Sequence, residues 1–410
     1  MSMLVINSGS SSIKTALFES DSLRRLFEVR VTGIGESDAE VHVGAKTAET
    51  RCDNHIAALD QVFVALTKEV RDLTDISAVG HRVVHGGEEL VASTIVSDEV
   101  ERVISSQNAL APLHNAACLT GIRVARDRLR NCPHVAVFDT AFHSTLPKHA
   151  RTYALPAEIT ARFGLRRFGF HGISHEYVSC AAARSLGAKL SGLRLISCHL
   201  GNGCSVTAVE NGRSVETSMG MTPLEGLVMG SRSGDLDPGV VIQLLRNYCS
   251  SADELETLLN RDSGLIGMTG TSDMRDIEER AAAGDQSCAL AIKIFVNRVQ
   301  KYIGAYAAAM GGVDAIILTG GIGENSAEIR HRILLSLTFL GAILDTHRNR
   351  CVDLTPEQPV IEISAARSRV KLLVVMTDEE AAIARSVADV LRHCTPGNPR
   401  ASGASRDSAR

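Results

Sequence analysis

The chain carries two strand–turn–strand segments of one design, and this repeat constrains its fold more than any other feature. In residues 195–209 (LISCHLGNGCSVTAV) an apolar run leads into a small, glycine-rich turn, and a second apolar run follows. Residues 4–18 (LVINSGSSSIKTALF) have the same pattern near the start of the chain. Each segment is typical of a β-hairpin. Two such hairpins, each opening one half of the chain, predict a duplicated fold.

Both predicted turns are suited to binding an anion. Their residues are small, so backbone N–H groups can approach a ligand closely. A single glycine-bearing turn is more often only a turn. The occurrence of two at equivalent places favours a nucleotide-binding fold that binds phosphate at both.

Composition is that of an ordinary soluble protein with room for two domains. The chain has 410 residues, 44% hydrophobic and 22% charged, with a net charge of −4. No basic block with aromatic residues is present, so we expect no nucleic-acid partner. We also expect no membrane segment and no secretion signal, because apolar runs are short and the start reads as a strand. Ten cysteines without a C-x-x-C pair indicate reduced thiols and a cytoplasmic protein.

Each hairpin is followed by alternating helical and strand patterns. Apolar spacing predicts long helices, and short apolar runs predict buried strands; the helices span 56–73, 112–129 and 289–310, and the strands 76–80, 135–138, 314–318 and 370–375. Ser174 is expected to cap a helix over 174–186, Asp237 a helix that begins at Pro238, and Thr377 with Glu380 a helix over 378–391. This order predicts two related α/β domains with a cleft between them. The expected domains are 1–143 plus 381–395 and 144–380, with a disordered tail at 396–410.

Three arginines lie in polar or glycine-rich surroundings, where they could bind a phosphoryl group. They are Arg82 in HRVVHGG, Arg232 in MGSRSGDLDP and Arg275 in TSDMRDIE. Phosphoryl transfer needs a phosphate cradle, a divalent metal and positive charge more than it needs covalent chemistry. The alternative for each arginine is a surface salt bridge. Glycine neighbours favour a functional role for Arg82 and Arg232.

Other candidates lie at strand ends and helix starts. Asp139 follows a predicted strand, where ligands bind in open α/β sheets, and Glu379 begins a predicted helix. Their alternatives are a strand terminator and a compensator of the helix dipole. His171, in RRFGFHGISH, is either a site residue or a hydrogen-bonded core histidine. Residues 319–325 (TGGIGEN) either enclose a nucleoside or form a glycine-rich turn.

Two common kinds of active site are missing from the sequence. No G-x-x-x-x-G-K-[ST] motif occurs, so the phosphate turns are not P-loops. No serine or cysteine nucleophile is evident beside a paired base.

Taken together, the motifs resemble those of the acetate kinase family, whose superfamily includes sugar kinases, actin and the heat-shock chaperone ATPases. The matching segments span about residues 3 to 385; they are LVINSGSSSIK, GHRVVHGG, APLHN, VFDTAFHSTLP, RRFGFHGISHEYV, CHLGNGCSV, TSMGMTPLEGLVMGSRSGDLDP, DSGLIG, TGGIGENS and TDEE. The resemblance implies two actin-like (ribonuclease H-like) α/β domains with the active site in the interdomain cleft. It also implies reversible, direct transfer of the ATP γ-phosphoryl group to acetate with Mg²⁺ or Mn²⁺.

The resemblance assigns a role to each matching residue. Asn7 and Glu379 would hold the metal, Arg82 the acetate carboxylate, and Asp139, His171 and Arg232 would be catalytic. A small pocket for the acetate methyl group would be lined by Val84, Leu113, Phe170 and Pro223. Nucleotide-binding residues would be Lys14, His199, Leu200, Gly201, Asn202, Gly203, Asp273, Met274, Arg275, Gly321, Ile322, Gly323, Glu324 and Asn325.

The resemblance implies an oligomeric state and leaves two alternative functions open. The family implies a homodimer formed through the second domain. A propionate or butyrate kinase on the same fold is the nearest alternative, because one methylene changes binding in an apolar pocket by only about 1–3 kcal/mol. An ATP-driven switch like actin or a chaperone is the alternative from another class, although it leaves Arg82 and Arg232 without a purpose.

Overall fold

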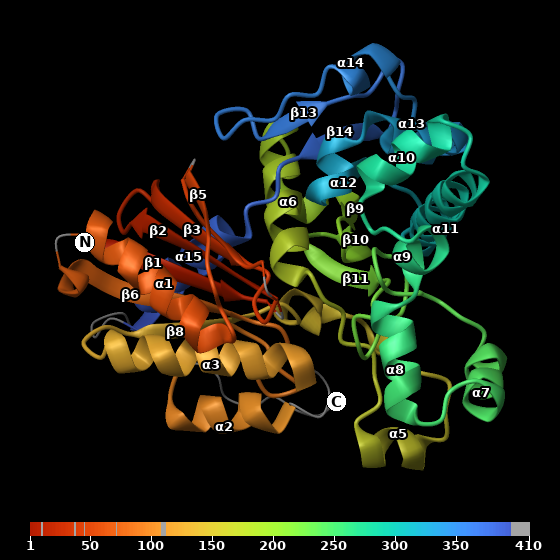
Figure 1. Ribbon diagram of the computed structural model, residues 1–410. Coiled ribbons are helices and arrows are strands. Elements are labelled where there is room, and N and C mark those ends of the chain that lie inside the picture. The colour runs from red at the N-terminus through yellow and green to blue at the C-terminus, as the bar shows by residue number, and fades with distance from the viewer. Residues whose placement is uncertain (10, 37, 45, 71, 108–111, 395–410) are drawn as a thin grey trace, which may run out of the picture. The chain divides into compact units, whose positions relative to one another are not determined.

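The structure, a computed structural model, describes residues 1–394 apart from 10, 37, 45, 71 and 108–111. These residues divide into two compact units (Figure 1). Unit 1 comprises Met1–Ala141 and the segment that begins at Glu379, and unit 2 comprises Phe142–Asp378. The tail expected at 396–410 lies outside the described residues. Within the described part of the chain, no helix is long and apolar enough to cross a membrane.

Unit 1 is built on an eight-stranded mixed sheet in the order β5-β4-β3-β2-β1-β6-β8-β7. Strand β1 pairs antiparallel with β2 and parallel with β6, and β6 pairs parallel with β8. The strands are β1 (Ser2–Ser8), β2 (Ser12–Glu19), β3 (Arg25–Thr32), β4 (Glu40–Val43), β5 (Lys46–Glu49), β6 (Ile76–Val83), β7 (Thr94–Ile95) and β8 (His134–Phe138).

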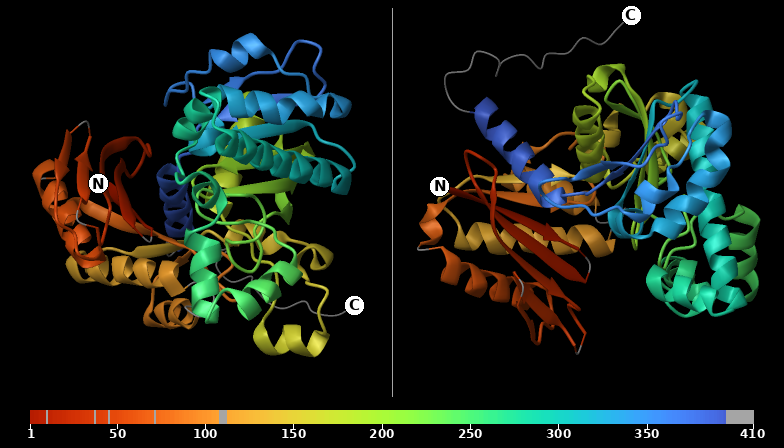
Figure 2. Two further views of the ribbon diagram at one scale, coloured as in Figure 1. Left: turned by 45° about the vertical axis from the view of Figure 1, so that its right-hand side comes forward. Right: turned by 90° about the horizontal axis from the view of Figure 1, so that it is seen from above.

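Helices cover both faces of this sheet (Figure 2). On one face, α1 (His55–Glu69) contacts β2 and β3 and buries its predicted apolar stripe in one core with Ile13 and Val29, with α3 (Pro112–Arg128) beside it. On the other, α15 (Glu379–Cys394) packs against β1 and β6, where a Cβ on Gly80 would lie 2.7 Å from Val387. The glycine therefore lets α15 approach the sheet closely. The remaining helices of this unit are α2 (Asp98–Ser106) and the short η1 (Leu73–Asp75).

Unit 2 is built on a six-stranded mixed sheet in the order β11-β10-β9-β12-β14-β13. Strand β9 pairs antiparallel with β10 and parallel with β12, and β12 pairs parallel with β14. The strands are β9 (Arg194–Leu200), β10 (Cys204–Glu210), β11 (Arg213–Thr217), β12 (Ala315–Thr319), β13 (Val360–Glu362) and β14 (Lys371–Val375).

Two helices cover most of the unit 2 sheet. Helix α6 (Gly172–Ser185) packs Val178 and Ala182 against Leu195 and Ile317, and α11 (Gln286–Ala309) packs against β9 and β10. Other elements are η3 (Ala141–Thr145), α4 (Lys148–Arg151), α5 (Ala157–Phe163), η4 (Leu190–Gly192), α7 (Pro238–Asn247), α8 (Ala252–Arg261), α9 (Gly264–Thr269), α10 (Met274–Ala282), α12 (Gly320–Asn325), α13 (Ala327–Leu335), η5 (Ser336–Leu340) and α14 (Thr346–Arg350).

The two sheets repeat one topology. In each, an antiparallel hairpin opens the sheet and a third antiparallel strand extends it, as β1-β2-β3 and β9-β10-β11 show. Two further strands then add in parallel on the other side of the first strand, β6 and β8 in unit 1 and β12 and β14 in unit 2. The predicted duplicated α/β fold is confirmed, and both predicted hairpins occupy equivalent places in it.

Two predicted helix caps are wrong. Helix α6 begins at Gly172 with His171 as its N-cap residue, and Ser174 lies inside the helix. Thr377 does not cap α15; its N–H donates to Glu324 and its hydroxyl lies 2.9 Å from Ser174 Oγ. The carboxylate of Glu380 accepts from Asn7 instead. Asp237 caps α7 as predicted, with Pro238 as its first residue.

Candidate active site

In unit 1, five polar residues gather where three parallel strands end; we call them the Arg82 cluster. Asn7 and Arg82 lie near the carboxyl ends of β1 and β6, and Asp139 directly follows β8. Glu379 and Glu380 are the first residues of α15. Parallel strands bring their carboxyl ends to one edge of a sheet, so residues distant in sequence meet there.

Arg82 is the centre of this cluster. Its Nη2 donates to Asp139 Oδ2 at 2.5 Å and its Nη1 to Asn7 Oδ1 at 3.3 Å. The Asn7 amide nitrogen donates to Glu379 Oε2 and to Glu380 Oε1, both at 3.2 Å. The Arg82 side chain is 15% exposed and that of Asp139 is 1% exposed, so the ion pair is largely shielded from water.

The carboxylates around Arg82 stabilise its protonated form. Burial alone would lower the pKa of the guanidinium, but the carboxylates of Asp139 and Glu379 outweigh it and raise the pKa above its ordinary value. The buried Nε–H of Arg82 makes no hydrogen bond with any described residue and lies 3.9 Å from Glu379 Oε2.

The same cluster holds the residues suited to a divalent metal. Glu379 and Glu380 present carboxylate oxygens on either side of one amide group, and oxygen ligands are those that Mg²⁺ and Mn²⁺ prefer. Asn7 turns its amide nitrogen, not its oxygen, toward them. Among the described residues, no group of three or more histidine, cysteine or acidic side chains is arranged to hold a metal ion. The donor set therefore fits an ion that is bound by few protein ligands together with water and substrate, as Mg²⁺ commonly is.

Loop residues behind Arg82 are fixed by a side chain that the sequence analysis did not single out. Asn115, fully buried in α3, accepts from the His85 N–H at 3.1 Å and donates to the His85 carbonyl at 3.1 Å. The Thr140 hydroxyl accepts from the Gly86 N–H at 3.2 Å. The signal was present, because Asn115 and Thr140 belong to the APLHN and DTAF segments. These contacts interlock the HRVVHGG loop with two neighbouring motifs.

Three other predicted residues belong to unit 1. Val84 is buried directly after β6, and Lys14 is exposed on β2, paired with Asn7 in the sheet register. The side chain of Leu113 lies outside the described residues.

In unit 2, a second group surrounds the tip of the β9–β10 hairpin; we call it the His171 cluster. It comprises His171, His175, His199, Ser205 and Arg232 together with the turn at residues 201–203. His171 has a positive φ of 57° at the N-cap of α6. Such a backbone is uncommon for a residue with a side chain and persists only where the surroundings hold it.

The hairpin tip is close to its neighbours because it lacks side chains. A Cβ on Gly203 would lie 3.3 Å from Nε2 of His171 and 3.8 Å from Nη1 of Arg232. A Cβ on Gly201 would lie 3.8 Å from His199 Nε2 and 3.8 Å from the Gly321 nitrogen. The predicted anion turn is therefore lined by two imidazoles, one guanidinium and the start of α12.

The turn is also fixed from outside. The Gly230 N–H donates to the Asn202 carbonyl at 2.8 Å, and the Gly201 N–H donates to the Gly203 carbonyl at 3.1 Å. Leu200 is fully buried at the end of β9, so its side chain serves the core and only its backbone can reach a ligand. These contacts fix the conformation of the tip, so that a ligand would bind to a preorganised loop.

Arg232 differs from Arg82 in having no carboxylate partner among the described residues. Its Nη1 donates to the Pro223 carbonyl at 3.2 Å, and burial lowers its pKa. Even so lowered, an arginine stays protonated at neutral pH. An unbalanced positive charge beside a glycine turn is suited to receive an anion.

Behind the hairpin lie histidines that the sequence analysis did not predict. His175 is fully buried, and its ring nitrogens lie 2.7 Å from Ser205 Oγ and 2.9 Å from Ser197 Oγ. Fully buried His143 donates from Nε2 to the Phe170 carbonyl at 2.9 Å and has Nδ1 2.8 Å from Ser214 Oγ. Burial lowers the pKa of His143 to about 4. The sequence offered only the motif letters HS and SH as a signal for them.

Predicted residues of the acyl pocket in unit 2 are Phe170 and Pro223. Phe170 is buried just before His171, and the carbonyl of Pro223 anchors Arg232. Both therefore contact or adjoin the His171 cluster.

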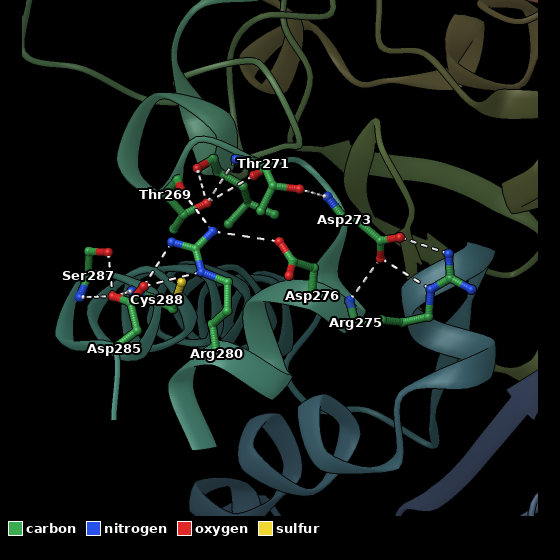
Figure 3. Close-up of polar contacts among 10 residues, drawn as sticks. Thr269, Thr271, Asp273, Arg275, Asp276, Arg280, Asp285, Ser287 and Cys288 are labelled. Atoms are coloured by element: carbon green, nitrogen blue, oxygen red, sulfur yellow. Dashed lines mark hydrogen bonds and ion pairs between the residues drawn. The ribbon is translucent and has the colours of Figure 1, made fainter. Parts of the chain in front are cut away.

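The two segments expected around the nucleoside are structurally different. Asp273 caps α10 and pairs with Arg275, whose Nη2 lies 2.7 Å from Oδ2; the arginine side chain is 84% exposed (Figure 3). Met274 is buried beneath them. Figure 3 shows a separate group in which Arg280 contacts Thr269, Asp276 and Asp285 and fixes the loop before α10.

Residues 321–325 form most of the short helix α12 rather than an open turn. Glu324 in this helix accepts from the Thr377 N–H at 3.1 Å and the Gly320 N–H at 2.8 Å, and burial raises its pKa. Asn325 donates to the Gly321 carbonyl at 2.8 Å. Gly321 is exposed, Ile322 is partly buried and Gly323 is buried. The Glu324 side chain thus joins the start of α12 to Thr377.

A duplicated α/β fold with arginines and a glycine turn at its strand ends is that of a phosphotransferase. The chain belongs to the acetokinase family, whose model matches residues 2–385. It is 46% identical over 392 residues to "Acetate kinase" of Bacillus cytotoxicus, covering 94% of this chain and 98% of that protein.

Solved structures of the family have the same fold. A Porphyromonas gingivalis acetate kinase matches with a TM-score of 0.88 and 38% identity, covering 95% of this chain and 99% of the other. A propionate kinase from Francisella tularensis matches with a TM-score of 0.87 and 39% identity, covering 94% and 98%.

Proposed function

We propose that this chain catalyses reversible transfer of the γ-phosphoryl group of ATP to acetate, which gives acetyl phosphate and ADP. The observation that carries the proposal is Arg232: a guanidinium with no carboxylate partner in the described part of the chain, beside His171 and a turn of small residues. Family membership supports the same reaction. An acetate oxygen forms a bond to the γ-phosphorus, and the bond from that phosphorus to the oxygen bridging the β-phosphate breaks.

This chemistry suits the residues of both clusters. The attacking carboxylate is already ionised at neutral pH, so no strong general base is required. The barrier then depends on alignment and on charge at the transferring group. Arg82 would hold the acetate carboxylate, Asp139 would fix Arg82, and His171 and Arg232 would stabilise the phosphoryl oxygens.

The nucleotide would be bound by backbone and polar groups of unit 2. His199, Asn202 and Gly203 would contact its phosphates, and residues 273–275 and 321–325 its adenosine. Lys14, exposed and without a carboxylate partner among the described residues, would contribute positive charge from β2. The exposed Asp273–Arg275 pair supports this, because its side chains can exchange partners with a ligand.

Mg²⁺, or Mn²⁺, would be bound by Glu379 with Asn7, after rotation of the amide to present Oδ1, and Glu380 is a further oxygen donor. When bound, the ion neutralises phosphate charge and helps to align the γ-phosphoryl group.

Propionate is a second candidate substrate, because a propionate kinase is among the structural matches. Val84, Leu113, Phe170 and Pro223 would line the acyl pocket. One methylene there changes transition-state binding by about 1–3 kcal/mol, so both acids would be accepted with different efficiency. We propose acetate as the better substrate, in keeping with the curated relatives.

We further propose a homodimer formed through unit 2. The apolar face of α11 packs inside unit 2, with Phe295, Val299 and Ile303 buried, so this helix does not offer an interface. Helix α7 is a better candidate, since none of its residues is buried and Tyr248, which follows it, is 71% exposed. Exposed apolar surface of this kind typically marks a protein interface.

The test is an acyl-phosphate assay with trapping by hydroxylamine. Purified protein with ATP, Mg²⁺ and acetate should form acyl hydroxamate, and parallel reactions with propionate and butyrate give the preference. ATP turnover that needs no carboxylate would instead support an ATP-driven switch and overturn the proposal.

A further inference from the structure

Four side chains of unit 2 form one hydrogen-bonded line that ends at His171. Ser197 Oγ lies 2.9 Å from His175 Nδ1, His175 Nε2 lies 2.7 Å from Ser205 Oγ, and Ser205 Oγ lies 2.9 Å from His171 Nδ1. Ser197, His175 and Ser205 are fully buried. The line starts in β9, passes through α6 and β10, and reaches the other side of the ring whose Nε2 faces Gly203.

Protons in this line can be assigned by asking which arrangement leaves no buried donor without an acceptor. A neutral histidine has one N–H and one acceptor nitrogen, and a serine hydroxyl has one proton. Neither Ser197 nor Ser205 has another side-chain hydrogen bond among the described residues. The hydroxyl proton of each must therefore point along the line.

Only one direction satisfies every group. The Ser197 hydroxyl donates to His175 Nδ1, His175 Nε2–H donates to Ser205, and the Ser205 hydroxyl donates to His171 Nδ1. In the reverse direction His175 donates to Ser197, whose own proton is then left without an acceptor. If His171 and His175 both donate to Ser205, its proton is left unpaired. Buried donors without acceptors are unfavourable, so the first direction is preferred.

The surroundings keep His175 neutral, as this assignment requires. Burial, followed by the neighbouring imidazoles of His143 and His199, holds the pKa of His175 well below its usual range. Their rings lie 5.9 Å and 6.3 Å from that of His175. His143 is itself held as the Nε2–H tautomer by the Phe170 carbonyl.

We propose that Ser197, His175 and Ser205 are positioning residues that hold His171 as its Nε2–H tautomer, with that N–H on the side of the Gly201–Gly203 turn. His171 then presents a hydrogen-bond donor at neutral pH without having to be cationic. The value of this donor to catalysis rests on the proposed function, in which His171 meets the phosphoryl oxygens. The tautomer itself does not depend on any reaction.

Nitrogen-15 NMR of protein labelled at histidine tests the assignment directly. The expected spectrum has an unprotonated Nδ1 and a protonated Nε2 for His171. In Ser205→Ala, His171 loses its donor at Nδ1 and the Nδ1–H tautomer should appear. Ser197→Ala removes the far end of the line without touching His171, and should also produce a mixture of tautomers. A spectrum of the unmodified chain with Nδ1 protonated and Nε2 bare would overturn the proposal.

Ser179→Ala is the matched control. Ser179 is a fully buried serine of α6, the helix that carries His175, and its hydroxyl has no hydrogen-bond partner among the described residues. Its removal should leave the His171 signals unchanged, whereas a change as large as that in Ser205→Ala would contradict a specific relay.

Steady-state kinetics add the functional consequence. Ser205→Ala should lower kcat about tenfold while the KM for ATP stays within about twofold, and Ser205→Thr, which keeps the hydroxyl, should restore most of kcat. If Thr and Ala behave alike, the hydroxyl does not act as proposed. A chain without acetate-dependent turnover would refute the proposed function alone, because the NMR result would still stand or fall on its own.

Discussion

Arg82 and Arg232 are both candidate site arginines, but their surroundings differ. Arg82 is balanced by Asp139 at 2.5 Å and by Glu379 at 3.9 Å. Among the described residues, the hydrogen-bond partners of Arg232 are neutral groups, the Pro223 carbonyl and the Met229 sulfur. Arg82 is held in an ion pair within unit 1, whereas no carboxylate of the described residues balances the charge of Arg232. We therefore expect substitution of Arg82 to lower mainly stability and substitution of Arg232 to lower mainly turnover.

Replacing Arg232 should reduce turnover far more than stability. Arg232→Leu removes a partly buried charge that no carboxylate balances, so we expect the melting temperature to stay the same or to rise. The kcat for acyl phosphate formation should fall by at least about 10²-fold, as for loss of one transition-state donor. Arg184→Leu, at an exposed position of α6, is the control. A variant with unchanged kcat would remove Arg232 from the mechanism.

Replacing Arg82, in contrast, should lower the stability of the protein. Arg82→Leu leaves Asp139 charged and buried, which should destabilise unit 1 by about 3–5 kcal/mol in urea unfolding. The double variant Arg82→Leu with Asp139→Leu should recover most of that loss, since neither charge is then left alone. Equal stability of the single and double variants would contradict a buried ion pair.

Among the elements, the β9–β10 hairpin is the one whose shape the proposed function needs most. Its register is set by the pairing of Cys204 with Leu200, which leaves a three-residue tip. The tip approaches His171 and Arg232 because Gly203 has no Cβ. In the proposed function, the tip of the hairpin would therefore meet the ligand with backbone rather than side chains.

Gly203→Ala should impair catalysis with little effect on folding. The added methyl group would lie 3.3 Å from the His171 ring and would occupy the space proposed for a phosphoryl oxygen. We expect kcat/KM for ATP to fall about tenfold or more while the melting temperature changes little.

Gly212→Ala, at the other end of β10, is the contrasting variant. Gly212 has a φ of +78°, so alanine there should cost about 1 kcal/mol of stability and leave kcat/KM unchanged. If both variants behave alike, the tip has no special role.

Elements were predictable where apolar spacing decides them and not where tertiary partners do. The stripe of α1 and the runs of β8 and β12 are local patterns, and they appear in the structure as expected. The starts of α6 and α15 were predicted wrongly. His171 takes the cap position in a left-handed conformation, and Thr377 is recruited by Ser174 and Glu324, partners distant in sequence.

The motif residues were likewise predictable, but not what each contacts. The Arg82–Asp139 pair joins residues 57 positions apart, and the Ser205 line joins α6 to two strands. Such distances become short only once the strand order is known. Asn115 and His175 were missed for that reason.

At the scale of the whole molecule, buried histidines make stability depend on pH. His81 and His134 in unit 1 and His143 and His175 in unit 2 all have lowered pKa values, chiefly through burial. The folded chain thus resists protonation of groups that the unfolded chain protonates near pH 6.5. The stabilisation is present above pH 6.5 and is lost as pH falls toward 4.

His143 alone should lower the unfolding free energy by about 2 kcal/mol between pH 7.5 and pH 5, given its pKa of about 4. Urea unfolding at the two pH values measures the change. His143→Gln should show a smaller difference between them. A stability that rises on acidification would contradict neutral buried histidines.

Assembly should depend on the exposed apolar residues of α7. Val240, Ile242, Leu245 and Tyr248 are 42–71% exposed. Changing Leu245 and Tyr248 together to Glu should convert a dimer into monomers in sedimentation velocity. Phe339→Glu, at an equally exposed residue of η5, should leave the dimer intact. Dissociation by the control and not by the α7 variant would place the interface elsewhere.

The proposed function depends on attack at the transferred phosphorus by the carboxylate of acetate rather than by water. The most direct test is phosphorus-31 NMR of a reaction containing ATP, Mg²⁺ and acetate labelled with ¹⁸O in both oxygens. We predict acetyl phosphate whose phosphorus signal carries the isotope shift of one attached ¹⁸O, formed at least about 10²-fold more slowly by Arg232→Leu. Inorganic phosphate without labelled acetyl phosphate would contradict the account.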